Sequence, residues 1–205
     1  MLVTIEGIDG AGKTTLAAGL AAALREHGVE AELLREPGGV ELSERIRELV
    51  KDPALEVDPR AEALLYAAAR AQLVASRLRP LLDAGRWVLL DRFVDSSLAY
   101  QGAGRGLGVE AVRAINELAC GGLVPDRTLL LRIDPAGGRA RASGRNEAPD
   151  RLELEADSFF ATIAAAYDEL AAAEPERIRV LDALAPPDDL VRQALVQVRD
   201  LLPRD

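Results

Sequence analysis

The chain is poor in the side chains that build disulfides and metal sites. Its 205 residues include one cysteine, Cys120, and one histidine, His27. A single thiol excludes an internal disulfide and a cysteine-based zinc site, so we expect Cys120 to be a small buried hydrophobe. His27 precedes Gly28 where a helical pattern ends, and we expect it to contact the carbonyl groups at a helix C-terminus.

Long hydrophobic runs and an excess of positive charge are also missing. No apolar run approaches the ~18 residues that a membrane span needs, so we expect no membrane segment. The net charge of −9 offers no general attraction to polyanions, which predicts that the chain binds neither nucleic acid nor acidic membranes. The first residues already read as a core strand, which leaves no signal peptide, and we expect a cytoplasmic protein.

The composition is that of one globular domain spanning residues 1–205, with 49% hydrophobic and 29% charged residues. Strand-like apolar runs alternate with helical patterns, which predicts a parallel sheet wrapped in helices. The predicted strands are residues 2–5, 30–35, 87–90, 126–133 and 178–181. The predicted helices are residues 16–24, 42–50, 59–84, 96–100, 109–119, 152–173 and 190–201. In the second of these helices we expect one apolar side made of Leu42, Ile46, Leu49 and Val50.

Residues 7–14 form a complete phosphate-binding loop of the pattern G-x-x-x-x-G-K-[ST], between an apolar strand and a helix as the motif requires. Its glycines let successive N–H groups turn toward one anion, and the positive end of the following helix points at the same place. Lys13 can reach the outer phosphates, and the Thr14 hydroxyl can ligate Mg²⁺. The predicted nucleotide-binding residues here are Gly7, Ile8, Asp9, Gly10, Ala11, Gly12, Lys13, Thr14 and Thr15. The sequence therefore predicts an α/β P-loop NTPase fold with a five-stranded parallel sheet and helices on both faces.

The strand at 87–90 ends in Asp91 and Arg92, and this pair narrows the class of P-loop protein. A switch GTPase needs an Asn-Lys-x-Asp motif, which is absent, and a motor ATPase favours Asp-Glu after this strand. Ligands of open parallel sheets lie outside the carboxyl ends of the strands. There Asp91 could hold Mg²⁺ and Arg92 could clamp a phosphate. The alternative is a structural ion pair at a strand end.

Four segments together carry a resemblance to a known family: R-E-P-G-G at 35–39, D-R-F at 91–93, S-S-L-A-Y-Q-G at 96–102 and G-R-G at 104–106. The chain resembles the thymidylate kinase (dTMP kinase) family, and the resemblance extends to D-R-L-E at 150–153. It implies transfer of the γ-phosphoryl group of ATP to dTMP with Mg²⁺, which gives ADP and dTDP for dTTP synthesis. It also implies a cytoplasmic homodimer, for which the Ala/Leu-rich helices are the expected contact surface.

The resemblance assigns residues to the acceptor dTMP. Arg35, with Glu36 and Pro37, is expected to hold the monophosphate, and Arg92 and Asp9 lie near the phosphate and the sugar hydroxyl. The residues expected at the base and sugar are Tyr66, which stacks on thymine, Arg70, Ser97 and Gln101, which read the base edge, and Tyr100, which crowds the sugar 2′ position. From the residues alone, Tyr66 could be core, Tyr100 a helix anchor and Arg35 a solvated arginine.

The phosphate loop carries no arginine, since Gly10 and Ala11 are uncharged. Phosphoryl transfer needs positive charge on the migrating group, so we expect that charge from a lid at about 139–153. Its arginines are Arg139, Arg141, Arg145 and Arg151. We favour Arg145 and then Arg151 as catalytic, and assign Arg139 and Arg141 to ATP, although a solvated helix end fits Arg139 well.

The expected catalytic residues are thus Asp9, Lys13, Arg92, Arg145 and Arg151. Two other functions stay open: another P-loop kinase of nucleotides or nucleosides, and a nucleotide-dependent switch that has lost phosphoryl transfer. Adenine contacts are not assigned, although the loop at 183–187 lies at the usual edge.

Overall fold

The computed structural model describes residues 1–144 and 149–203. A five-stranded parallel sheet runs through their centre in the order β2-β3-β1-β4-β5. The strands are β1 (Leu2–Glu6), β2 (Ala31–Arg35), β3 (Trp87–Asp91), β4 (Arg127–Arg132) and β5 (Ile178–Asp182). The predicted fold class and all five predicted strands are therefore confirmed. Because the strands are parallel, their carboxyl ends form one edge, where the phosphate loop follows β1.

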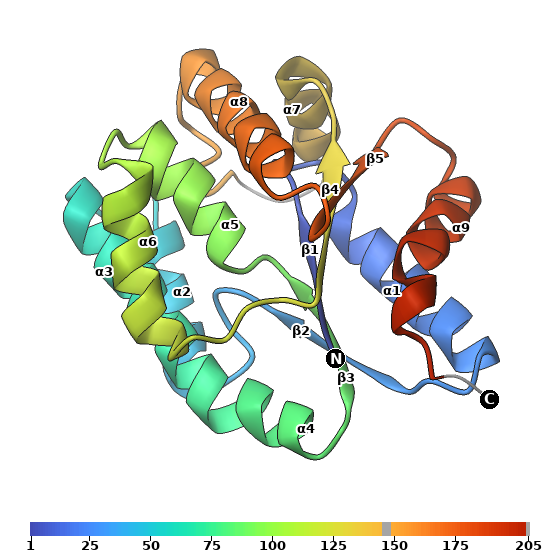
Figure 1. The fold of residues 1–205 in the computed structure, drawn as a ribbon. Coiled ribbons are helices and arrows are strands. Elements are labelled where there is room, and N and C mark those ends of the chain that lie inside the picture. The colour runs from blue at the N-terminus through green and yellow to red at the C-terminus, as the bar shows by residue number, and fades with distance from the viewer. Residues whose placement is uncertain (145–148, 204–205) are drawn as a thin grey trace.

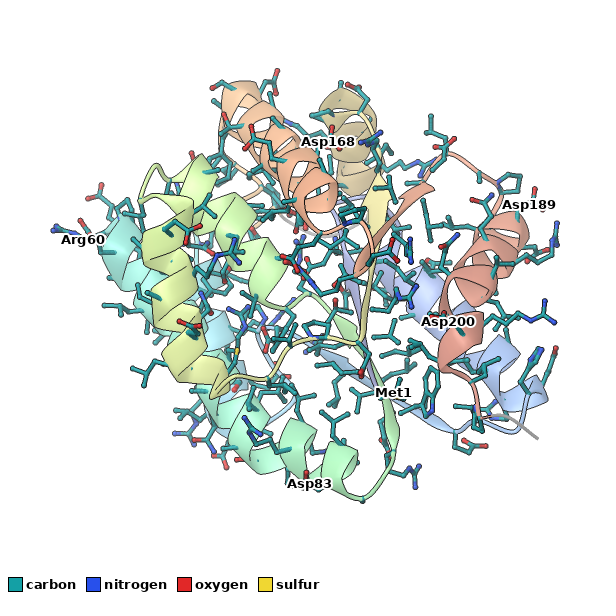
Figure 2. The ribbon with its side chains drawn as sticks, in the orientation of Figure 1. Met1, Arg60, Asp83, Asp168, Asp189 and Asp200 are labelled. Atoms are coloured by element: carbon teal, nitrogen blue, oxygen red, sulfur yellow. The ribbon has the colours of Figure 1, made fainter. Side chains whose placement is uncertain are left out.

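Helices cover both faces of the sheet (Figure 1). On one side α1 (Lys13–Glu26) packs against α9 (Pro187–Val198), which a short 3₁₀ turn, Arg199–Leu201, follows. The other side carries α6 (Val109–Cys120) and α8 (Asp157–Ala173). Charged side chains such as Arg60 and Asp189 point outward from these layers (Figure 2). In the part of the chain that the structure describes, no helix has the length and apolar character of a membrane span.

The predicted helix at 59–84 is helical throughout residues 59–83, but its middle turn is π-helical. It consists of α3 (Pro59–Leu73), a π-helical turn at Val74–Leu78 and α4 (Arg79–Asp83). Pro80 has no N–H to donate and its ring crowds the preceding turn, which the wider π geometry accommodates. A second π-helical segment, Leu98–Gly104, follows the short α5 (Val94–Ser97) and carries residues of the predicted site.

Near the segment expected to form a lid, one helix prediction is wrong and one helix was not predicted. The helix expected from residue 152 begins at Asp157, because the Asp150 carboxylate accepts hydrogen bonds from the N–H groups of Leu152 and Glu153 and holds the chain in turns. An unpredicted helix, α7 (Pro135–Ser143), overlaps the first residues of the segment expected to form a lid, 139–153. It starts with Asp134, whose side chain accepts from Gly137 N, and a proline in the first turn.

The expected apolar side of α2 (Glu41–Lys51) is also wrong in part. Ile46 and Val50 are buried, but Leu42 and Leu49 are 48% and 49% exposed.

The predictions for the single cysteine and the single histidine are confirmed. Cys120 is buried in a cluster of hydrophobic side chains, and His27 Nδ1 lies 3.0 Å from the carbonyl oxygen of Ala23 at the end of α1.

Candidate active site

A cavity of about 690 Å³ opens at the carboxyl ends of β1, β2 and β3. Its walls come from the phosphate loop, the loop after β2, α2, α3 and the π-helical segment at 98–104. The predicted site residues that line it are Asp9, Gly10, Gly12, Lys13, Thr14, Thr15, Arg35, Glu36, Pro37, Tyr66, Arg70, Asp91, Arg92, Ser97, Tyr100, Gln101 and Arg141. Residues from distant parts of the sequence therefore share one cavity.

The phosphate loop adopts the backbone that its glycines permit. Gly10 and Gly12 have φ angles of 79° and 94°, and Gly12 leads directly into α1 without a side-chain cap. The free N–H groups of the first turn of α1 are therefore open to an anion. Lys13 Nζ donates to the carbonyl oxygens of Gly7 at 3.1 Å and Ile8 at 2.9 Å. Burial, with repulsion from Arg92, lowers the pKa of Lys13 to about 8.

Helix α7 rests on the phosphate loop backbone to backbone. A Cβ atom on Gly138 would lie 2.8 Å from Asp9 O and 2.8 Å from Ile8 Cδ1, and one on Gly10 would lie 2.0 Å from Gly138 O. Only glycine at both positions permits this approach. Arg141, on the same helix, lines the cavity and donates to the carbonyl oxygen of Ala183 at 2.9 Å, so it links α7 to the 183–187 loop.

Two oxygen-bearing side chains meet beside the loop. The Thr14 hydroxyl donates to Asp91 Oδ2 at 2.9 Å. A hydroxyl and a carboxylate next to a phosphate site are the donors with which proteins hold Mg²⁺, whose other ligands are waters and phosphate oxygens. Among the described residues no group of three or more His, Cys, Asp or Glu side chains could hold a metal. The donor set thus fits an ion that is held jointly with a nucleotide.

Arg92 lines the cavity and contacts several other residues of its wall. Its Nη2 donates to Asp9 Oδ1 at 2.7 Å and to the Tyr100 hydroxyl at 3.2 Å, and its Nη1 donates to Gly7 O at 3.1 Å. The Tyr100 hydroxyl in turn donates to Asp9 Oδ2 at 3.0 Å. Burial alone would raise the pKa of Asp9, but Arg92, Lys13 and the Tyr100 hydrogen bond outweigh it and hold that pKa well below its usual range. Asp9 is therefore an ionised acceptor beside the phosphate loop.

Buried Glu6 supports the turn that carries Arg92. Arg92 has a φ of 70°, a left-handed conformation that costs energy in a residue with a side chain. Glu6 Oε1 accepts from Phe93 N at 2.6 Å, and Glu6 Oε2 accepts from the hydroxyls of Ser96 at 2.5 Å and Tyr167 at 2.9 Å. The Ser96 hydroxyl also accepts from Arg92 Nη1 at 3.1 Å. Burial and the nearby charge of Asp95 raise the pKa of Glu6 from 4.5 to about 7.

The cavity wall also carries the predicted base-binding residues. Tyr66 and Arg70 come from α3, one turn apart, and both line the cavity. Arg70 is 2% exposed, and its guanidinium is bound by protein groups: Glu36 Oε2 at 2.7 Å, Ser97 Oγ at 2.9 Å, Phe93 O at 2.8 Å and Asn116 Oδ1. Arg70 thus fixes the positions of Glu36 and Ser97 as well as facing the cavity.

Beside Arg35, two basic residues that the sequence did not mark, Arg47 and Lys51, also line the cavity. Arg35 Nη2 lies 3.1 and 3.3 Å from the two carboxylate oxygens of Glu44. Arg47 donates to Pro37 O at 3.0 Å, and Lys51 pairs with Asp150 at 2.7 Å. Lys51 is one of only two lysines in the chain, a signal that could have marked it, whereas nothing distinguishes Arg47 on a helix rich in charge.

The remaining predicted residues lie elsewhere. Arg139 pairs with Asp157 and lies over the Phe160 ring, outside the residues that line the cavity. Arg151 likewise does not line it; it donates to Glu62 Oε2 at 2.6 Å and to Val50 O at 3.0 Å. Arg145 lies outside the described residues. Within the phosphate loop, Gly7, Ile8 and Ala11 do not line the large cavity, and the first two border a smaller one of about 220 Å³.

Comparison with known proteins points to one family. The family model described as thymidylate kinase matches residues 5–194. The chain is similar to the thymidylate kinase of Halorhodospira halophila, with 47% identity over 98% of this chain and 94% of that protein. It is also similar to the thymidylate kinase of Deinococcus radiodurans, with 51% identity over 93% and 92% of the two chains. The crystal structure of thymidylate kinase from Ehrlichia chaffeensis superposes with a TM-score of 0.78 at 28% identity and covers 98% of both chains.

The contact between α7 and the phosphate loop predicts the effect of one methyl group. In Gly138→Ala the added carbon would meet Asp9 O and Ile8, so α7 or the loop must shift. We expect ATP to bind roughly ten-fold more weakly, since overpacking commonly costs about 1–3 kcal/mol. Gly137→Ala is the matched control, because its new carbon would lie 3.6 Å from Ile133, an ordinary contact. Calorimetric titration of both variants decides: equal ATP affinities would contradict the predicted role of this contact.

The raised pKa of Glu6 predicts a pH dependence of stability. Because the folded protein binds this proton more tightly than the unfolded chain, the stabilisation is complete below about pH 4.5 and is lost as the pH rises through about 7. Glu6→Gln cannot titrate, and its amide can still accept from Phe93 and donate to a hydroxyl. Between pH 5 and pH 8 we expect this variant to gain on the order of 3 kcal/mol of unfolding free energy relative to the parent protein.

Urea denaturation at the two pH values measures this difference. The control is Glu26→Gln, which changes an exposed residue at the end of α1 and should track the parent protein. Parallel pH curves for the parent protein and Glu6→Gln would show that the carboxylate is ionised throughout.

Proposed function

This chain belongs to the thymidylate kinase family and phosphorylates dTMP to dTDP, and we propose that ATP and dTMP meet in the cavity on either side of Arg92. The observation that carries this arrangement is that the phosphate loop and the wall that contains Tyr66 and Gln101 line the same cavity of about 690 Å³. A donor phosphate on the loop and a pyrimidine between these side chains would bring the two reacting phosphates to the Asp91–Arg92 turn.

The donor phosphates are assigned to the loop at 7–15. The N–H groups of the loop and of the first turn of α1 would bind the β-phosphate, and Lys13 would exchange its two carbonyl partners for phosphate oxygens. Arg141 lies between the cavity and the 183–187 loop, which suits it to the nucleoside end of ATP. Arg139 is assigned to ATP on the resemblance alone, since it pairs with Asp157 here.

We assign Mg²⁺ to Thr14 and Asp91, whose oxygens lie 2.9 Å apart beside the loop. When bound there, the ion would offset negative charge on the transferred phosphoryl group. The side chains have the task of positioning. The acceptor is a phosphate monoester, whose second pKa is about 6, so its attacking oxygen is already ionised near neutral pH and no general base is required.

Arg92 and Asp9 are assigned to the acceptor. Arg92 has a fixed position through its contacts with Asp9, Tyr100 and Gly7, and its guanidinium would exchange one of these partners for an oxygen of the acceptor phosphate. Ionised Asp9 can accept a hydrogen bond from the sugar hydroxyl of dTMP. Tyr100 donates to Asp9, and the resemblance assigns it to crowd a 2′ substituent of the sugar. Arg35, Glu36 and Pro37, which also line the cavity, are assigned to the monophosphate.

We assign the positive charge that stabilises the migrating phosphoryl group to the lid at about 139–153. Arg145 remains the first choice for this role. Arg151 holds an ion pair with Glu62 and a hydrogen bond to Val50 O, which it would have to exchange in order to reach a phosphate. Those contacts favour an anchoring role for Arg151 at the end of the lid, and they leave transfer to Arg145.

The Tyr66 assignment predicts a selective defect. Stacking on an aromatic ring is worth about 1–3 kcal/mol per base, so Tyr66→Ala should raise the KM for dTMP by roughly ten-fold or more and leave the KM for ATP nearly unchanged. Tyr66→Phe keeps the π face and serves as the control, with near-parental constants. A coupled assay of ADP release supplies both constants, with dTMP, dUMP, dCMP, dGMP and UMP compared as acceptors. Preference of the parent protein for dGMP would defeat the assignment of Tyr66, Arg70 and Gln101.

We also propose that the chain forms a homodimer through α2, α3 and α6. These three helices pack side by side on one flank of the molecule (Figure 1). Each presents large exposed apolar side chains, namely Leu42 and Leu49 on α2, Leu64 on α3 and Leu118 on α6, the last 87% exposed. Exposed leucines on adjacent helices favour a protein–protein contact over a solvated face.

Charge on this flank should therefore separate the subunits. We expect Leu64→Glu combined with Leu118→Glu to sediment as a monomer, because carboxylates would be buried without partners in the dimer. Val196→Glu on α9 is the matched control, since Val196 is 65% exposed on the opposite side of the sheet and its substitution should leave a dimer. Analytical ultracentrifugation at micromolar concentration distinguishes the two; a dimer in all three proteins would place the interface elsewhere.

A further inference from the structure

Glu62 on α3 is a fully buried carboxylate with no role so far, at 0% exposure. It accepts four hydrogen bonds. Oε1 accepts from Gln101 Nε2 at 2.8 Å and from Arg105 Nε at 3.2 Å. Oε2 accepts from Arg105 Nη2 at 3.0 Å and from Arg151 Nη2 at 2.6 Å. Two arginines and one amide thus converge on a single buried acidic residue.

The two arginines keep Glu62 ionised. Burial raises the pKa of a carboxyl group, but here the hydrogen bonds from Arg105, Gln101 and Arg151 outweigh burial, and the pKa of Glu62 lies below its ordinary value. Arg105 is held in turn by Glu155, at 2.5 Å, and by the face of the Phe159 ring. An ionised carboxylate has no hydrogen to donate and can only accept. In every hydrogen bond with Glu62, the partner must therefore be the donor.

This requirement decides which end of the Gln101 amide faces the cavity. A side-chain amide has an NH₂ donor at one end and an oxygen acceptor at the other, and it can turn either way. Because Glu62 only accepts, the NH₂ end must point to it, which leaves the Gln101 oxygen for the cavity that Gln101 lines. Among the described residues, none donates a hydrogen bond to that oxygen.

We propose that Glu62 is a specificity-determining positioning residue, which fixes the Gln101 amide so that the site presents an acceptor to the edge of the pyrimidine. Thymine and uracil carry an N3–H donor that matches this acceptor. Cytosine has a lone pair at N3, so two acceptors would face each other there. The inference rests on the proposed function, in which the base of dTMP lies against Gln101, and it assigns the rejection of cytosine to a residue that never touches the base.

The test is the ratio of kcat/KM for dTMP to kcat/KM for dCMP. In Glu62→Gln the new amide can accept or donate, so both orientations of Gln101 become available, and we expect the ratio to fall at least about ten-fold, as expected when a site loses one buried matched hydrogen bond. Glu26→Gln, an exposed change on α1, should keep the parental ratio. A folded Glu62→Gln protein with an unchanged ratio would overturn the proposal.

A second background separates positioning from general destabilisation. If Glu62 acts through Gln101, then Glu62→Gln should not change the ratio further in a Gln101→Ala protein, although it lowers the melting temperature in both backgrounds. An equal fall of the ratio in both backgrounds would assign the effect to another route. A parent protein that does not phosphorylate dTMP would contradict the proposed function itself, which is a separate outcome.

A measurement on the parent protein covers the case in which Glu62→Gln does not fold. In ¹⁵N-glutamine-labelled protein, the side-chain amide of Gln101 is identified by its loss in Gln101→Ala. We expect one of its two protons to exchange slowly with solvent in the absence of nucleotides, because it is bound to buried Glu62. Exchange of both protons at the rate of a free glutamine would overturn the proposal.

Discussion

The site depends on how the backbone turns after β3. Arg92 has a left-handed φ of 70°, and this conformation directs its guanidinium back over the phosphate loop. Such a backbone persists only where its surroundings hold it. Here Arg92 N donates to Ile5 O at 3.0 Å and Phe93 N donates to Glu6 at 2.6 Å, so β1 holds the turn through both a strand carbonyl and a buried carboxylate. The strand that carries the phosphate loop therefore also positions the arginine opposite it.

Buried charges in the cavity wall are tolerable because they have charged or hydrogen-bonding partners. An unpaired charge in the interior costs far more than a paired one with its hydrogen bonds satisfied. Arg70 is 2% exposed, yet it contacts Glu36, Ser97 and a backbone carbonyl. These pairs contribute little net stability compared with apolar packing, but they fix directions. A rigid guanidinium in a wall gives the cavity a shape that a flexible surface arginine could not.

Features that depend on a local sequence pattern could be predicted from the sequence. Features that depend on contacts between distant parts of the chain could not. The phosphate loop has a fixed spacing, and the strands are apolar runs, so both were found. Helix α7 was missed because its small polar segment has no apolar stripe, and it is defined by the close contact of Gly138 with the loop. Glu62 was missed because its partners Arg105 and Arg151 are 43 and 89 residues away, and a glutamate in a helix rich in alanine carries no signal of burial.

A chain of hydrogen bonds that starts at Arg92 connects these contacts. Arg92 donates to the hydroxyls of Ser96 and Tyr100, and each hydroxyl donates to a carboxylate, Glu6 and Asp9 respectively. A hydroxyl can turn its hydrogen in any direction, but the Tyr100 hydroxyl, which lies between the Arg92 cation and ionised Asp9, has a single choice. The orientation of a hydroxyl or an amide, which could face either way, is thus fixed by charged groups that can only donate or only accept. Recognition of a base or a phosphate depends on which atom donates, so we expect the charged residues behind the cavity wall to influence its selectivity together with the residues at its surface.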